Sequence, residues 1–172
     1  MHSRKSGASL TQERLFELLK YNPSSGLFFW KLNRRGKLNK GDIAGSINGN
    51  GYVVIRIDGK LHYAHRLAWL YCNGSFPDFL IDHANGITSD NRLINLRKST
   101  HSENQCNRRK PSSNSSGIKG IHWNSHYKKW HATIEVNGKR FDIGRFSDIK
   151  KAKSAIRTAR NKLHGDFANH GL

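Results

Sequence analysis

The stretch IDHANGITSDNRLINLRKSTHSENQCN, residues 81–107, gathers the polar side chains of this sequence that are best suited to chemistry. Asp82 and His83 are adjacent in it, and neighbouring side chains on an extended backbone point in opposite directions. One of them could therefore hold a metal ion while the other faces a different reactant. The pair Asn85-Gly86 follows, and because both residues tolerate positive φ, we expect the chain to double back there.

The second half of the stretch predicts a returning strand at 95–97 and then a short helix. Thr100 and Glu103 have the spacing of a capping box, in which each side chain satisfies a free backbone N–H at a helix start. Asn104 would lie in the first helical turn, with its side-chain carbonyl able to point back toward Asp82. Two hard oxygen ligands with room for water and phosphate oxygens suit Mg²⁺, and an imidazole beside such an ion is a candidate base for activating water.

The order of Asp82-His83, Asn95 and Asn104 resembles the HNH endonucleases, also called ββα-metal nucleases. The branch it resembles is that of phage and intron homing endonucleases, whose third motif residue is Asn. The resemblance implies that His83 is the general base and that Asp82 and Asn104 bind one divalent metal ion per site, Mg²⁺ or Mn²⁺. Asn95 would brace the hairpin and orient His83. His101 is an alternative to Asn104 as the third motif residue, and we prefer Asn104.

Charge and cysteine content narrow the class of protein. Lys and Arg number 30 against 12 Asp and Glu, a net charge of +18, and such a field attracts phosphate backbones. Residues 105–172 hold 15 of these basic but only 4 of the acidic residues, a net charge of +11, so we expect the stronger contact with double-stranded DNA there. Cys72 and Cys106 form no Cys-x-x-Cys pair, which argues against a zinc knuckle or a disulfide framework.

The sequence predicts neither export nor a membrane span. Residues 1–7 lack an apolar core of signal-peptide length, and no run approaches the length of a membrane helix. We therefore expect a protein of the bacterial host cytoplasm, and the resemblance implies that a phage encodes it. No coiled coil and no protein partner is evident from the sequence, which favours a monomer or a weak dimer.

The residues before this stretch predict a mixed arrangement of helices and strands, and the HNH resemblance covers roughly 9–107. The expected elements are a helix over 9–20, a strand over 27–31, a hairpin of 51–57 and 60–65 around Asp58-Gly59, and a helix over 65–71. The basic segment 33–50, which contains Arg34, Arg35, Lys37 and Lys40, is either a loop that contacts phosphate or a solvated charge cluster.

After residue 107 the composition changes, and we place a domain boundary there. The basic, Ser- and Asn-rich segment 108–117 is expected to be a flexible linker between a nuclease domain over 1–107 and a second domain over 118–172. In the second domain, apolar and polar residues alternate. This pattern predicts three antiparallel strands over 119–124, 130–136 and 139–146, followed by a helix from Ser147-Asp148 to about His164.

Three strands backed by one helix, with Gly120-Ile121 and the runs 129–134 and 143–146, resemble an AP2 domain. The resemblance implies that the exposed sheet face lies in the DNA major groove, which is wide enough for strands. By position it directs seven residues toward DNA: Lys119, His122, Asn124, Lys129, Thr133, Arg140 and Arg145. Glu135 and Asp142 depart from the AP2 pattern, so a base preference cannot be transferred.

Together these features predict an α+β protein in which a ββα-metal (HNH) nuclease unit precedes a small AP2-like sheet-and-helix domain. We expect a metal-dependent DNA endonuclease of the homing type that hydrolyses phosphodiester bonds. One HNH site handles one strand, so a monomer should nick and a double-strand break would need a dimer or a second engagement. The alternatives are a DNA-binding regulator with an inactive HNH remnant and a basic RNA- or ribosome-binding protein.

Overall fold

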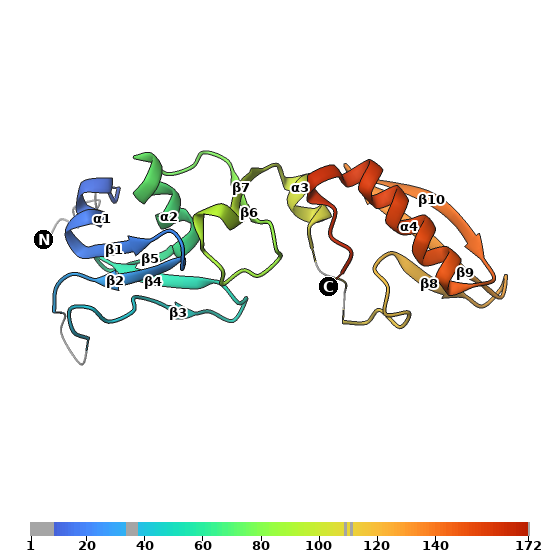
Figure 1. The fold of residues 1–172 in the computed structure, drawn as a ribbon, viewed down its shortest axis with the longest axis horizontal. Coiled ribbons are helices and arrows are strands. Elements are labelled where there is room, and N and C mark those ends of the chain that lie inside the picture. The colour runs from blue at the N-terminus through green and yellow to red at the C-terminus, as the bar shows by residue number, and fades with distance from the viewer. Residues whose placement is uncertain (1–8, 34–37, 109, 111, 172) are drawn as a thin grey trace, which may run out of the picture. The chain divides into compact units, whose positions relative to one another are not determined.

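The computed structural model divides into two compact units, Met1–Arg97 and Lys98–Leu172 (Figure 1). It describes four stretches of the chain, residues 9–33, 38–108, 110 and 112–171. Residues 34–37 of the predicted basic loop lie outside these stretches, as do Arg109 and Pro111 of the predicted linker. Among the described residues, no helix is both long and apolar enough to cross a membrane.

The first unit combines helices with small antiparallel sheets. β1 pairs with β2, β4 lies between β3 and β5, and β6 pairs with β7. The last two residues of β7 are assigned to the second unit. The elements in chain order are α1 (Gln12–Leu18), β1 (Leu19–Asn22), β2 (Leu27–Trp30), β3 (Ser46–Ile47), β4 (Val53–Ile57), β5 (Lys60–Tyr63), α2 (Ala64–Asn73), β6 (Leu80–His83), the 3-10 helix η1 (Leu93–Asn95) and β7 (Leu96–Ser99).

Helix α1 is shorter at both ends than the helix predicted over 9–20. The Thr11 side chain caps it by accepting a hydrogen bond from the Arg14 backbone N–H at 3.2 Å. The prediction of helix through residue 20 is wrong, because the chain continues from Leu19 as strand β1. Leu19 and Tyr21 are buried on this strand while Lys20 between them is exposed, and this alternation pairs β1 with β2.

The core of the first unit lies between the two helices and the strands. Helix α2 confirms the helix predicted over 65–71, and Leu67 and Leu70 on it are buried. The largest side chains in this core that are almost completely buried are Leu15, Leu19, Phe28, Ile55, Ile57, Leu67 and Leu70. Burial of an aliphatic or aromatic side chain of this size contributes about 1.5–3 kcal/mol, so these residues hold the strands and helices of the unit together.

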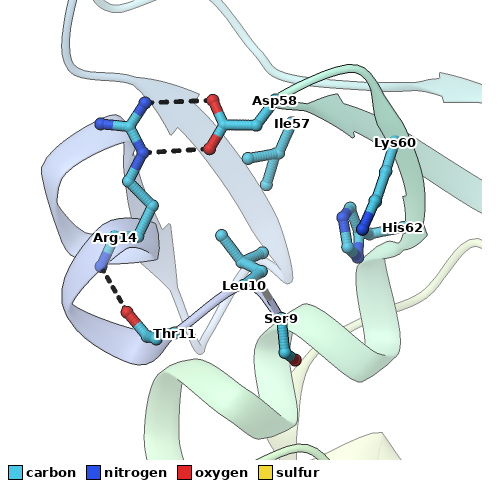
Figure 2. A pocket seen from close by; sticks show the side chains of 8 residues that line it. All are labelled: Ser9, Leu10, Thr11, Arg14, Ile57, Asp58, Lys60 and His62. Atoms are coloured by element: carbon cyan, nitrogen blue, oxygen red, sulfur yellow. Dashed lines mark hydrogen bonds and ion pairs between the residues drawn. The ribbon is translucent and has the colours of Figure 1, made fainter. Parts of the chain in front are cut away.

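The turn between β4 and β5 confirms the hairpin predicted at Asp58-Gly59, since both residues have positive φ, 45° and 83°. The Asp58 carboxylate also accepts two hydrogen bonds from Arg14 on α1, each 3.0 Å long. Figure 2 shows this pair at the edge of a pocket that is lined by residues 9–11, by Arg14 on α1 and by the β4–β5 hairpin. Both side chains are well exposed, so the pair fixes α1 against the hairpin without forming part of the core.

The second unit contains the predicted three-stranded sheet and its covering helix. The sheet order is β10-β9-β8, and α4 lies along its apolar face (Figure 1). Five side chains make up the buried core between them, Ile121, Ala132, Ile134, Ala152 and Ile156. The elements in chain order are α3 (His101–Cys106), β8 (Ile121–Asn124), β9 (Lys129–Val136), β10 (Lys139–Phe146), α4 (Ile149–His164) and the 3-10 helix η2 (Gly165–Phe167).

Helix α3, which follows β7 directly, groups with the second unit. The sequence predicts a boundary after residue 107, whereas the two compact units divide between Arg97 and Lys98. Strands β6 and β7 and helix α3 have the strand-strand-helix order of a ββα-metal nuclease. The helix of this motif packs against β9 and η2, which follow it in the chain.

Candidate active site

Strand β6 places Asp82 and His83 at consecutive positions, and only 4 % of each residue is exposed. The Asp82 carboxylate is held by Arg97 on the paired strand β7. Arg97 Nε donates to Asp82 Oδ2 at 2.8 Å, and Arg97 Nη2 lies 2.7 Å from the same oxygen. Because a buried charge is costly without a counter-charge, Arg97 stabilises this carboxylate inside the fold.

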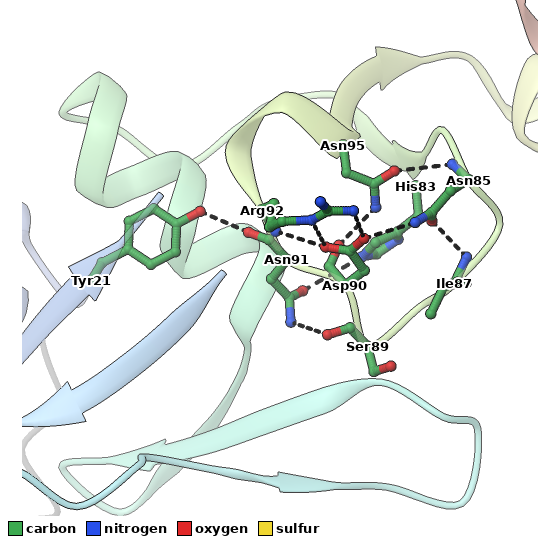
Figure 3. A network of polar contacts seen from close by, with 9 residues as sticks. All are labelled: Tyr21, His83, Asn85, Ile87, Ser89, Asp90, Asn91, Arg92 and Asn95. Carbon is green, nitrogen blue, oxygen red and sulfur yellow. Dashed lines mark hydrogen bonds and ion pairs between the residues drawn. The ribbon is translucent and has the colours of Figure 1, made fainter. Parts of the chain in front are cut away.

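The imidazole of His83 faces the side chain of Asn91, which is also buried (Figure 3). The distance from His83 Nε2 to Asn91 Oδ1 is 3.5 Å. Two further hydrogen bonds fix Asn91. Its side-chain Nδ2 donates to the Ser89 backbone carbonyl at 3.1 Å, and its backbone carbonyl accepts from the Tyr21 hydroxyl at 2.7 Å. A rigid polar residue therefore lies against one nitrogen of the His83 ring.

Aromatic rings pack around His83 and keep it away from bulk water. The ring centroid of His65 lies 5.1 Å from that of His83, nearly perpendicular to it, and the Tyr52 centroid lies at 5.9 Å. Burial lowers the pKa of His83 below its usual value, although the Asn91 contact and the carboxylates of Asp82 and Asp90 oppose part of this effect. The imidazole is therefore neutral at neutral pH, the protonation state that a general base needs.

Asn95 joins the two ends of the loop between β6 and β7. Its side-chain oxygen accepts from the Asn85 backbone N–H at 3.0 Å, and its Nδ2 donates to the Asp90 carbonyl at 2.8 Å. The Asn95 backbone carbonyl also accepts from the N–H of Ala84, the residue after His83, at 2.9 Å. These contacts brace the loop beside His83 through its main chain (Figure 3).

Asp90 supplies a second set of contacts within the same loop. Its carboxylate accepts from Arg92 Nε at 2.8 Å and Nη2 at 2.6 Å, and from Asn85 Nδ2 at 2.7 Å. The Arg92 hydrogen bonds are the largest cause that lowers the Asp90 pKa to about 2. Asp90 therefore joins Asn85 at the start of the loop to Arg92 near its end. These contacts limit the positions that Asn91, which lies between Asp90 and Arg92, can take.

The β1–β2 hairpin supports this loop from the other side. The Tyr21 hydroxyl on β1 donates to the Asn91 backbone carbonyl, and the Pro23 carbonyl in the turn of the hairpin accepts from the Leu93 backbone N–H at 3.1 Å. Gly26, with φ of +74°, comes so close to the loop that an added Cβ would lie 2.4 Å from the Arg92 nitrogen and 2.6 Å from the Asn91 carbonyl carbon. Only glycine fits here, because this position needs both a left-handed backbone and a missing side chain.

Gly26→Ala is expected to lower the free energy of unfolding of the first unit by more than Gly59→Ala does. Both glycines have similar positive φ, so both variants incur a backbone cost of about 1–2 kcal/mol. At Gly59 an added Cβ meets no described atom within 4 Å, whereas at Gly26 it displaces the loop that carries Asn91. Urea unfolding of the three proteins measures the difference, and equal losses would contradict the close approach.

Asn104 lies in the short helix α3 of the second unit and is half-buried. The capping box predicted at its start is confirmed: Thr100 Oγ1 accepts from the Glu103 N–H at 3.2 Å, and the Glu103 carboxylate accepts from the Thr100 N–H at 2.7 Å. His101, the alternative motif residue, is exposed, and its Nε2 lies 3.2 Å from Gln105 Nε2. Asp82 belongs to the first unit and Asn104 to the second.

Six of the seven residues predicted to contact DNA lie on the sheet face of the second unit that α4 does not cover. Register pairs His122 and Arg145 with the same residue of β9, His131, so the three form a row across the sheet. Asn124 pairs with Lys129, while Thr133 and Arg140 lie opposite Asp142 and Glu135. His131, which sequence reasoning left out of the site, lies in the middle of this face, with its Nε2 3.1 Å from Asp142 Oδ1.

The seventh residue, Lys119, lies before β8 and is not part of the paired strands. Its ammonium donates to the Cys106 carbonyl at 2.8 Å and to the Arg108 carbonyl. Strand β8 begins only at Ile121, and Gly120 with φ of +79° interrupts the alternation of side chains before it. The structure therefore groups six of the predicted residues on one face and directs the Lys119 ammonium to the end of α3.

Lys119 gives the second unit a pH dependence of known sign. Burial, assisted by the Arg160 charge, lowers the Lys119 pKa from 10.5 to about 8. Between these values the unfolded chain binds more protons than the folded one, so stability rises with pH. We expect the free energy of unfolding to increase from pH 7.5 to pH 9.5 more steeply in the wild type than in Lys119→Met. Urea unfolding at both pH values measures this, and equal slopes would contradict it.

Two neighbours of His83 were not assigned a role from the sequence. Asn91 lies in the stretch 81–107, between the Asn85-Gly86 pair and Asn95. Its position among several polar residues was the only sign in the sequence that it could belong to the site. His65 is the second residue of helix α2 and is 9 % exposed, and burial is the main cause that lowers its pKa to about 3. No local pattern places either residue against His83: Asn91 is only eight residues away but reaches it through an irregular loop, and His65 comes from a different element.

Comparison with known proteins agrees with this geometry. A family model described as HNH endonuclease matches residues 62–106, which include α2, β6, β7 and α3. The chain therefore carries an HNH endonuclease domain. It is also 35 % identical over 105 residues to Protein 3.8 of Escherichia phage T7, across 60 % of this chain and 86 % of that protein. The chain belongs to the same family as this phage protein. No solved structure matches it.

The family match ends at residue 106, before β8 begins. It therefore does not bear on the AP2-like assignment of residues 118–172, which stays a prediction. In the described part of the chain, no group of three or more His, Cys, Asp or Glu side chains lies close enough together to hold a metal ion.

Proposed function

We propose that the protein is a metal-dependent DNA endonuclease of the homing type that hydrolyses phosphodiester bonds through its HNH domain. The observation that carries this proposal is a neutral, buried His83 directly after a buried Asp82, within the segment that matches the HNH endonuclease family. A histidine kept neutral beside a carboxylate is the pair that hydrolysis of a phosphate ester needs, one to accept a proton and one to bind a cation.

His83 acts as the general base in this proposal. Its neutral imidazole accepts a proton from the attacking water, and the Asn91 contact at Nε2 limits rotation of the ring. Asn95 has a positioning role, because its contacts with Ala84 and Asn85 fix the main chain just after His83. Attack on the phosphorus with departure of the 3′ oxygen leaves 5′-phosphate and 3′-hydroxyl ends.

Asp82 and Asn104 are the proposed ligands of a single Mg²⁺ or Mn²⁺ ion. A carboxylate and an amide oxygen fit the preference of these ions for oxygen donors, and both ions complete their coordination with water and phosphate oxygens. When bound, such an ion stabilises negative charge on the phosphate and on the departing oxygen. Arg97 keeps the Asp82 carboxylate in place through its contacts with Oδ2.

The exposed sheet face of the second unit is the proposed DNA-binding surface, in the manner of an AP2 domain. It combines basic side chains with hydrogen-bonding ones, the six residues His122, Asn124, Lys129, Thr133, Arg140 and Arg145. The Arg145 guanidinium lies 4.5 Å from the ring centroid of Tyr127, which holds this cation at the surface. Phosphate contacts by such residues supply affinity, whereas contacts with base edges would supply selection.

Replacing Lys129, Arg140 and Arg145 together by alanine is expected to weaken DNA binding and to flatten its salt dependence. Each lost phosphate contact reduces the slope of log K against log salt by roughly 0.9. The matched control is the triple alanine variant of Lys150, Lys151 and Lys153, which removes the same charge from exposed positions on α4. Fluorescence anisotropy from 50 to 300 mM salt gives both slopes, and equal reductions would show that the sheet face is not the DNA surface.

Strand scission tests the proposed activity itself. The purified protein should convert supercoiled plasmid to nicked circles with Mg²⁺ or Mn²⁺ and should stop when EDTA is added. A regulator with an inactive HNH domain would bind duplex DNA under the same conditions and leave the plasmid supercoiled. An RNA-binding protein would bind structured RNA more tightly than duplex DNA.

A further inference from the structure

Helix α3 is too short to be stable by its own hydrogen bonds. It has six residues, and only Cys106 among them is buried. Isolated helices below about 12–15 residues are marginal in water, so α3 depends on contacts at its ends and sides. The capping box satisfies its first turn, which leaves the carbonyl groups of the last turn to be stabilised by other parts of the chain.

Residues from two later segments supply those contacts at the C-terminal end of α3. Lys119 donates to the Cys106 carbonyl at 2.8 Å and to the Arg108 carbonyl just beyond the helix. Asn169 Nδ2 donates to the carbonyl of Asn107, the C-cap residue, at 2.8 Å and to its side-chain oxygen at 3.2 Å. A lysine at this end also interacts favourably with the helix dipole.

The two donors are themselves fixed by the second unit. Arg160 on α4 is 2 % exposed, and its Nη2 donates to the Lys119 carbonyl at 2.7 Å. The Asn169 side-chain oxygen accepts from the Gly171 N–H at 2.7 Å, which sets the direction of its amide. At the other end of α3, the Ser102 hydroxyl accepts from the Asn137 N–H of the β9–β10 turn at 3.1 Å. Sheet, helix and C-terminal segment thus all take part in holding α3.

We propose that the second unit positions the metal-binding helix of the nuclease, with Lys119 and Asn169 as its positioning residues. The inference rests on the proposed function, in which Asn104 on α3 is a metal ligand. The C-terminal unit then has two separate tasks on two separate surfaces. Its exposed sheet face binds DNA, while Lys119 and the C-terminal segment hold α3 in the conformation that presents Asn104.

The isosteric variant Asn169→Asp tests the contact with the helix. It keeps the acceptor for Gly171 but replaces the donor by an oxygen facing the Asn107 oxygens. Amide exchange of the Asn104 and Asn107 N–H groups, both hydrogen-bonded within α3, should become at least about tenfold faster. Asn161→Asp, the same change at an exposed position of α4, should leave their exchange at the wild-type rate. Unchanged exchange in Asn169→Asp would overturn the inference without reference to nuclease activity.

Metal dependence of cleavage tests the consequence for the active site. In Asn169→Asp the Mn²⁺ concentration that gives half-maximal plasmid nicking should rise about tenfold or more, while DNA affinity measured in EDTA stays within about twofold of the wild type. Lys119→Met should behave in the same way, and Lys119→Arg, which keeps a cationic donor, should restore most of the wild-type metal response. An unchanged Mn²⁺ response would overturn the positioning role. A wild-type protein that never nicks would instead contradict the proposed function, and amide exchange would still decide whether the second unit holds α3.

Discussion

Replacing His83 by alanine is expected to reduce strand cleavage by about 10²–10⁴-fold, the usual contribution of a positioned general base. DNA affinity should stay near that of the wild type, because the proposed DNA surface lies in the second unit. Cleavage should fall because His83 is neutral and directly follows Asp82, and no nearby histidine can replace it as the base. The second buried histidine nearby, His65, has a pKa of about 3 and is a poor proton acceptor. Single-turnover nicking of a supercoiled plasmid measures the effect.

A matched control separates loss of the base from a general effect of removing histidine. His62 on β5 is partly buried in the same unit and stacks on Phe76, with ring centroids 6.1 Å apart. His62→Ala should therefore cleave at close to the wild-type rate. If His83→Ala retains cleavage while circular dichroism shows that both variants are folded, another group is the base.

Asp82→Asn is expected to cause a loss of similar size and to change how cleavage depends on metal. The amide keeps an acceptor for Arg97 but lacks the negative charge that attracts a divalent cation. At a fixed Mg²⁺ concentration nicking should fall at least about a hundredfold, and higher Mn²⁺ should restore part of it. Nicking rates across a metal titration measure both effects.

The control for Asp82 is Asp58, an aspartate of this unit whose carboxylate also accepts two contacts from an arginine of a distant segment. Asp58→Asn makes the same chemical change in the β4–β5 turn, where Asn also tolerates the positive φ of 45°. Its metal response should equal that of the wild type. Equal shifts in the two variants would mean that Asp82 affects cleavage through folding and not as a ligand.

Features set by a few neighbouring residues could be predicted from the sequence. The Asp58-Gly59 turn has positive φ at both positions, as this residue pair predicts for the tight turn that joins two antiparallel strands. The Thr100–Glu103 capping box formed as its spacing indicates. The strand-strand-helix order of β6, β7 and α3, with Asp82 and His83 on one strand, is the order that the HNH resemblance implies.

Features that depend on packing between distant segments could not be predicted. Leu19 fits the apolar face of a helix as well as it fits a strand, and only its pairing with Trp30 decides that it begins β1. Asn91 and His65 become neighbours of His83 through the tertiary fold. The AP2 resemblance directs Lys119 toward DNA by position, and sequence alone does not indicate that the positive φ of Gly120 separates it from strand β8, which begins at Ile121.

The measurement that tests the central claim most directly is the binding of Mn²⁺ to the protein in the absence of DNA, followed by electron paramagnetic resonance. We predict one site per chain, weakened about tenfold or more by Asp82→Asn and by Asn104→Ala, with a combined loss in the double variant that is smaller than the sum of the two, because both residues hold the same ion. Binding that is unchanged in Asn104→Ala, or losses that add fully in the double variant, would contradict a metal ion shared by these two residues.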